Sequence, residues 1–154
     1  MNLKQLFTVL LLLGVLGLVL FLPSLIESPS HQDDEKLSYP SCSLNQGACT
    51  VRSQLYGDIK ISVSPDNFQA LKPLDVVLSS RNGDISSVLI SLDGKDMYMG
   101  LNQAELKRTG ESGRWQGLIT IPVCTVDADM AWLFSVTLKG QGTERLVFNI
   151  TSKH

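Results

Sequence analysis

The sequence predicts an all-β protein, an immunoglobulin-like β-sandwich of about seven strands preceded by one transmembrane helix. Three observations lead to this fold class. The chain has 154 residues, which is room for about one domain. It begins with a long apolar run that carries no charge, and from about Cys42 onward apolar and polar residues alternate in short segments between turn formers. Such alternation is typical of half-buried strands, and about seven of them in roughly 105 residues match the size of an immunoglobulin-like sandwich.

The N-terminal apolar run predicts a membrane anchor. The 17 residues from Leu6 to Leu22 are uncharged, and all but three are large and apolar. As a helix this segment covers roughly 26 Å, or about 36 Å when extended to Leu3 and Ile26, against a hydrocarbon core of about 30 Å. A cleaved signal peptide is the alternative, but the exit from Pro23 to Pro29 has no small-x-small cleavage site. We therefore expect a retained signal anchor at residues 1–26.

The residues on either side of the anchor predict its orientation and a stalk. Lys4 and the terminal amine precede the apolar run, and positive charges are retained in the cytoplasm. The bulk of the chain is then expected outside the cytoplasm, in the periplasm if the source is bacterial. Turn formers and charges fill residues 27–41, as in a linker, which leaves 42–154 as the periplasmic domain.

The alternating segments place the strands of that domain. Trp132, Phe134, Val136 and Leu138 form the clearest inward-facing row, whereas Trp115 stands at a strand start and is expected to be less deeply buried. Asn102–Arg108 alone has a helical appearance. The seven strands are expected around Ala48–Gln54, Ile59–Val63, Leu74–Leu78, Val88–Leu92, Trp115–Ile121, Trp132–Leu138 and Leu146–Ile150.

Composition argues against nucleic-acid binding and against catalysis. The net charge is −2 with no basic block, and affinity for nucleic acid depends on Lys and Arg at phosphates. The two histidines, His31 and His154, both lie in expected tails, so no Ser-His-Asp or Cys-His arrangement can be built in the domain. The loop carboxylates Asp93, Asp96, Asp127 and Asp129 are of the kind that turns select for local hydrogen bonds. We expect no enzyme activity.

The three cysteines predict one disulfide and one separate thiol. Cys42 and Cys49 have six residues between them, and Asn45, Gln46 and Gly47 permit a turn there. Outside the cytoplasm such a pair is expected to be bridged. Cys124 is then left over, either as a buried inert thiol or as a metal ligand.

The methionines supply a candidate metal site. Met97 and Met99 would point the same way if the segment is extended, and Met130 precedes the Trp132 strand. Thioether and thiolate ligands select Cu(I), so Met97, Met99, Met130 and Cys124 are the candidate ligands of a copper site at one end of the sandwich. Core packing is the alternative role for methionines next to strands.

The order of these motifs resembles the FixH/YtkA-like family. The resemblance rests on Met97-x-Met99-Gly100, then Gly113-Arg114-Trp115 at one strand start and Met130-Ala131-Trp132 at another. Ala131 stands where glycine is common in that family. The resemblance implies a bacterial inner-membrane protein with a periplasmic sandwich, acting in haem-copper oxidase assembly or copper handling with oxidase subunits or assembly factors as partners. The alternative is an interaction module that binds an inner-membrane complex without metal.

Overall fold

The computed structural model describes residues 2–26, 35–81, 84–123 and 130–152. In the N-terminal helix, the side chains of residues 3, 9 and 19–26 lie outside this description. The chain divides into two compact units, Met1–Gln32 and Asp33–His154.

The first unit contains a single described helix, α1 (Leu3–Ile26). Its sequence is rich in leucine, a strong helix former, and its charge is confined to Lys4. Large apolar side chains are exposed all along its described part: Leu6, Phe7, Leu10, Leu11, Leu12, Leu13, Val15, Leu16 and Leu18. Among the described residues, no helix combines the length and the apolar character needed to cross a membrane.

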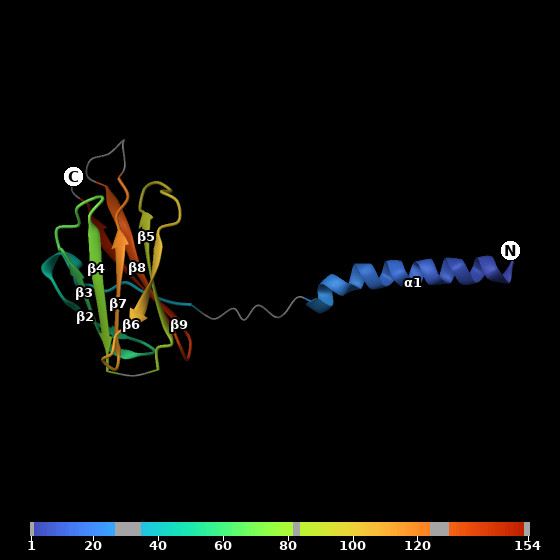
Figure 1. Cartoon of the computed structure of the whole chain (residues 1–154), viewed down its shortest axis with the longest axis horizontal. Helices are drawn as coiled ribbons and strands as arrows, with labels where there is room; N and C mark the ends of the chain where they lie inside the picture. Colours follow the sequence, from blue (N-terminus) through green and yellow to red (C-terminus); the bar gives the residue numbers. More distant parts are fainter. Residues whose placement is uncertain (1, 27–34, 82–83, 124–129, 153–154) are drawn as a thin grey trace. The chain divides into compact units, whose positions relative to one another are not determined.

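The second unit is built from strands (Figure 1). One short 3-10 helix, η1 (Leu44–Gln46), interrupts them, and the Ser43 side chain caps it by accepting from the Asn45 N–H. The strands are β1 (Lys36–Ser38), β2 (Cys49–Ser53), β3 (Gly57–Ser64), β4 (Pro73–Ser80), β5 (Ser87–Gly94), β6 (Gln103–Arg108), β7 (Arg114–Thr120), β8 (Ala131–Lys139) and β9 (Thr143–Thr151).

The nine strands pair in the order β1-β9-β8-β5-β6-β7-β4-β3-β2. β6 joins two halves of this sheet, because its residues 103–106 pair with β5 whereas Lys107 and Arg108 pair with β7. All described pairings are antiparallel except that of β1 with β9. The two halves therefore face each other across one interior, in a nearly barrel-like arrangement.

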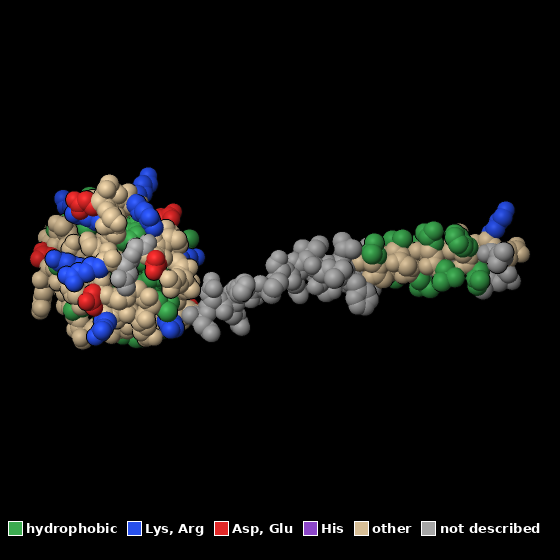
Figure 2. All heavy atoms as spheres, turned by 90° about the horizontal axis from the view of Figure 1, so that it is seen from below, with side chains coloured by type: hydrophobic (Ala, Val, Ile, Leu, Met, Phe, Trp, Pro, Cys, Tyr) green, Lys and Arg blue, Asp and Glu red, His purple; other side chains and the backbone are tan. Residues whose placement is uncertain are grey.

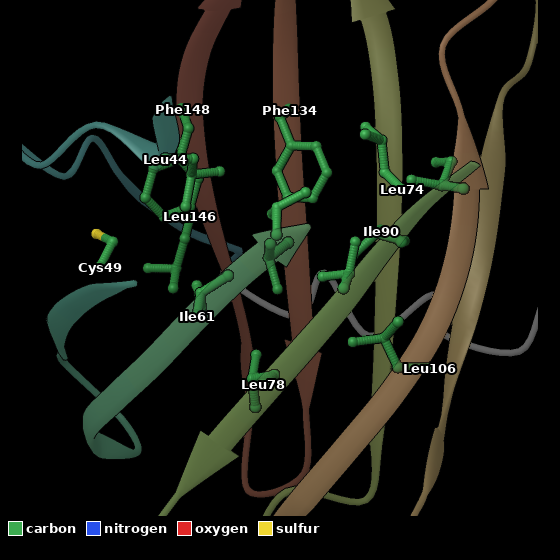
Figure 3. Close-up of a cluster of buried hydrophobic side chains, with 14 of the residues drawn as sticks. Leu44, Cys49, Ile61, Leu74, Leu78, Ile90, Leu106, Phe134, Leu146 and Phe148 are labelled. Atoms are coloured by element: carbon green, nitrogen blue, oxygen red, sulfur yellow. The ribbon is translucent and has the colours of Figure 1, made fainter. Parts of the chain in front are cut away.

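Alternating residues of every long strand fill that interior. Figure 3 shows side chains from both halves and from η1 meeting in one cluster, in which the Phe134 and Phe148 rings pack edge to face with centroids 6.4 Å apart. The core members labelled there are Leu44, Cys49, Ile61, Leu74, Leu78, Ile90, Leu106, Phe134, Leu146 and Phe148. The period-2 pattern read from the sequence thus marks the buried face of each strand.

The structure confirms the all-β class and corrects two elements. Asn102–Arg108 is not helical, since Gln103–Arg108 forms β6. Its residues favour helices when isolated, but a position between β5 and β7 offers backbone partners on both sides, which decides the conformation. Lys36–Ser38, in the segment expected to be a stalk, forms β1. The described residues form nine strands instead of about seven.

The expected difference between the two tryptophans is also wrong. Trp115 is 1% exposed and Trp132 is fully buried. Trp115 lies opposite Leu78 on β4, and the guanidinium of Arg108 lies 5.4 Å from its ring centroid. A tryptophan at a strand start is therefore buried here because Arg108 and the neighbouring strand cover it.

Candidate functional site

The β3–β4, β5–β6 and β7–β8 connections gather at one end of the domain, here called the methionine end (at the top of Figure 1). Backbone and side-chain hydrogen bonds tie these connections together. Leu71 N–H donates to the Ile121 carbonyl at 2.9 Å, and Asn102 Nδ2 donates to the Thr120 carbonyl at 2.8 Å. Lys95 N–H donates to the Ala131 carbonyl at 3.0 Å. These hydrogen bonds link the described parts of the three connections.

Two of the predicted metal ligands come together at this end. A Cβ atom placed on Gly94 would lie 2.4 Å from Cε of Met130 and 3.1 Å from Cγ of Met99. Both thioether side chains therefore approach the same point at the end of β5, and only a glycine leaves room for them. Met130 is 6% exposed and belongs to the core, and Met99 packs against that core.

The other two predicted ligands are placed differently or lie outside the description. Met97 follows β5 in a bend rather than an extended segment, and its side chain is 44% exposed. Its carbonyl oxygen, not its side chain, approaches Gly94. Cys124, Asp127 and Asp129 lie outside the described residues. Within the described ranges, no group of three or more His, Cys, Asp or Glu residues is arranged to hold a metal ion.

Exposed apolar side chains are concentrated at the methionine end. In the described part of the second unit, eight large apolar side chains are exposed, and five of them lie here. The other three are Leu37, Tyr39 and Leu118. The five, here called the apolar patch, are between 37% and 86% exposed: Leu71, Met97, Tyr98, Leu101 and Val123. Exposed Asp66, Asp93 and Asp96 flank the patch, together with Lys72 and Lys95.

The opposite end, here called the hairpin end, holds the β2–β3, β4–β5, β6–β7 and β8–β9 connections and contains a buried carboxylate that the sequence analysis missed. Glu144 is fully buried at the start of β9. Its Oε2 accepts hydrogen bonds from Ser53 Oγ at 2.6 Å and Leu55 N–H at 3.1 Å, and its Oε1 accepts from Gln54 N–H at 3.1 Å. The sequence does hold a signal, since Glu144 has the same parity as the inward-facing Leu146, Phe148 and Ile150.

Two further contacts hold the segments around β2 in place. Cys42 and Cys49 form a disulfide with Cα atoms 5.9 Å apart, as predicted from their spacing. Tyr56 is buried, and its hydroxyl donates to the Gly142 carbonyl in the β8–β9 turn. Tyr56 and Glu144 together link the β2–β3 turn to the β8–β9 turn and to the start of β9 at the hairpin end.

Comparisons with known proteins give no relative for this chain. No family model matches it, and no curated protein or solved structure is similar enough to be matched.

Proposed function

We propose that this protein is a membrane-anchored interaction module whose apolar patch binds a protein partner outside the cytoplasm. The observation that carries the proposal is the clustering of five exposed apolar side chains on three connected loops. Contiguous exposed apolar surface marks interaction sites, and tyrosine and methionine are enriched in protein interfaces. An enzyme is not proposed, because the sequence places both histidines in its tails.

A protein partner fits the patch better than a lipid surface does. β1 is parallel to β9 and begins beside Glu144, so the chain runs into the domain from the hairpin end, opposite the patch. Among the described residues, the exposed charged side chains flanking the patch are three acidic and two basic, whereas anionic lipid surfaces attract basic segments. The occupant is therefore an apolar surface on a component of an inner-membrane complex.

The anchor part of the proposal rests on α1 and its sequence. The helix is apolar on every side along its described part, and such a helix requires an apolar environment all around it. Leu6–Leu22 carries no charge. With Lys4 held in the cytoplasm, the second unit lies outside it, where a Cys42–Cys49 disulfide is stable.

The pairing order supports an immunoglobulin-like sandwich as the finer description of the fold. Counted from β3, the first, second and fifth strands (β3, β4, β7) are neighbours, and so are the third, sixth and seventh (β5, β8, β9). This is the grouping of an immunoglobulin-like Greek key, with β6 pairing to both groups. β1 and β2 are then additions at the two edges.

Photo-crosslinking in native membranes tests the interaction module. A photoreactive residue at Tyr98 should give one discrete adduct with a single protein. Leu101→Ser should reduce the yield of that adduct about fivefold or more, because an interface residue of this kind contributes about 1 kcal/mol of binding free energy. Leu118 is also apolar and exposed, and it lies on β7 rather than in one of the three connections, which makes Leu118→Ser the matched control. No adduct from Tyr98, or an equal loss with Leu118→Ser, would contradict the proposal.

Copper handling in the assembly of a haem-copper oxidase is the second candidate, and one observation favours it. Met99 and Met130 approach the same point beside Gly94, as two ligands of a Cu(I) site would. A third sulfur ligand, from Met97 or Cys124, would complete the site. The resemblance to the FixH/YtkA-like family supports this function.

Copper retention distinguishes the two candidates. If the second holds, the reduced full chain in detergent should retain one Cu(I) per chain against a moderate chelator. Met99→Leu and Met130→Leu should each lose it, because leucine keeps the volume but has no sulfur. Leu118→Ser serves as the control that should retain copper. A chain that retains no copper leaves the interaction module as the function.

A further inference from the structure

A polar cleft of about 370 Å³ opens on the outer side of the β2-β3-β4-β7 half, next to the hairpin end. Three cationic side chains from three separate elements line it: Lys60 on β3, Arg81 after β4 and Arg114 at the start of β7. Thr50, Ser79 and Ser112 contribute hydroxyl groups to the same lining. Neither the apolar patch nor the methionines contribute to this cleft.

The sheet register explains why these side chains meet. Thr50 lies opposite Lys60, Lys60 opposite Ser79, and Ser79 opposite Arg114, so four strands present one row of outward-facing polar residues. Residues directly opposite each other on one face of a sheet lie about 5 Å apart at Cβ. These residues line the base of the cleft, and Arg81 continues the row past the end of β4.

Gly113 shapes the wall of the cleft. It adopts a φ of 73° and its carbonyl accepts from Ser80 N–H at 2.8 Å. A Cβ at this position would lie 2.2 Å from the Ser80 carbonyl oxygen, so any other residue would push the β6–β7 turn away from β4. This close approach places Ser112 and Arg114 beside Lys60 and Arg81.

The charges in the cleft favour an anion. Three cations face two carboxylates, those of Asp58 and Glu111, although the whole chain has a net charge of −2. Glu111 already pairs with Arg114 at 2.8 Å. Lys60 and Arg81 make no ion pair within the part of the chain that the structure describes. Lys60 and Arg81, together with the hydroxyl donors that line the cleft, match the oxygens of a phosphate group.

We propose that this cleft binds a phosphate-type oxyanion, with Lys60 and Arg81 as the principal cationic contacts. The phosphate belongs either to a lipid headgroup or to a free phosphate or phosphoester. β1 begins at the hairpin end, and Figure 2 views the domain from that end, where Lys and Arg side chains lie with Asp and Glu between them. A lipid source depends on the proposed anchor, whereas binding of the oxyanion itself does not.

Calorimetric titration of inorganic phosphate into the full chain, held in a maltoside detergent that contains no phosphate, tests the site. We expect saturable binding that Lys60→Gln with Arg81→Gln weakens about tenfold or more. Lys72→Gln with Lys95→Gln removes the same charge at the methionine end and should change affinity by less than about twofold. The proposal would be overturned if phosphate showed no saturable binding, or if both double variants weakened the binding equally.

Reconstitution of the full chain into phosphatidylglycerol nanodiscs separates the two sources of phosphate. Weaker inorganic phosphate binding there than in maltoside means that headgroups occupy the cleft. Equal binding in both means that the occupant is a free phosphate or phosphoester. Either result supports the oxyanion site, and neither depends on whether the apolar patch binds a protein.

Discussion

Replacing Trp132 by alanine should lower the free energy of unfolding by about 3–5 kcal/mol. The indole is fully buried on β8, directly between Gly94 on β5 and Ile150 on β9. Its Nε1 donates to Ser152 Oγ at 3.1 Å, and that hydroxyl also donates to the Met130 carbonyl at 3.4 Å, so truncation leaves a large cavity and removes one of the two hydrogen bonds of the buried hydroxyl. For a domain with a total stability of about 5–15 kcal/mol, this loss is a large fraction. Denaturant unfolding followed by circular dichroism measures it.

Two variants separate packing from hydrogen bonding at this position. Ser152→Ala removes the acceptor of the indole N–H, together with the weak hydrogen bond from Ser152 Oγ to the Met130 carbonyl, and should cost about 1–2 kcal/mol. Leu118→Ala shortens an exposed apolar side chain on β7 and should stay within about 0.5 kcal/mol of the unmodified chain. A Trp132→Ala variant as stable as Leu118→Ala would show that β8 does not present this residue to the core.

The Glu144→Ala variant should lose about 3 kcal/mol or more of unfolding free energy. Its carboxylate accepts from Ser53 Oγ and from two backbone N–H groups, those of Gln54 and Leu55. Alanine removes the shared acceptor of all three donors, of which the Leu55 N–H keeps Ser53 Oγ at 3.2 Å, and a buried donor left unpaired costs about 1–3 kcal/mol. The loss should appear as a lower midpoint in urea with an unchanged slope, because the residue fastens a turn without altering the surface buried elsewhere.

The matched control is Glu105→Ala on β6, an exposed glutamate in a strand, which should change stability by less than about 0.5 kcal/mol. Glu144→Gln should fall between Glu144→Ala and the unmodified chain. A glutamine still offers one oxygen acceptor, but it turns an amide nitrogen toward a second donor. Equal stability of Glu144→Ala and Glu105→Ala would mean that the turn does not need the carboxylate.

Period-2 alternation predicted the strands correctly where apolar residues mark every inward position, as in the Trp132 to Leu138 row. It failed where a strand has few inward apolar residues. β6 buries Leu106 deeply, and its remaining residues are helix formers, so only the neighbouring strands decide its conformation. Glu144 was missed for a related reason, since an inward carboxylate breaks the apolar pattern and its three donors lie about 90 residues earlier in the chain.

The methionine end could be predicted only in part. Connectivity predicted that Met97, Met99, Met130 and Cys124 converge at one end of the domain; Met99 and Met130 do approach Gly94, Met97 is exposed, and Cys124 lies outside the described residues. Met97 and Tyr98 are exposed because the chain bends after β5. The sequence had predicted an extended segment there, so this exposure was not expected. The oxyanion cleft depends on the register between four strands, and register is not visible in any single segment.

The pairing of β1 with β9 determines when folding can finish. β1 is the first strand to be synthesised, and its partner in the described chain, β9, is the last. Ser53 and Glu144, 91 residues apart, must likewise find each other late. During synthesis β1 therefore lacks its final partner until the end of the described chain has been made, and loop-closure entropy makes such non-local pairing slow. We therefore expect this domain to complete its fold only after β9 has been synthesised.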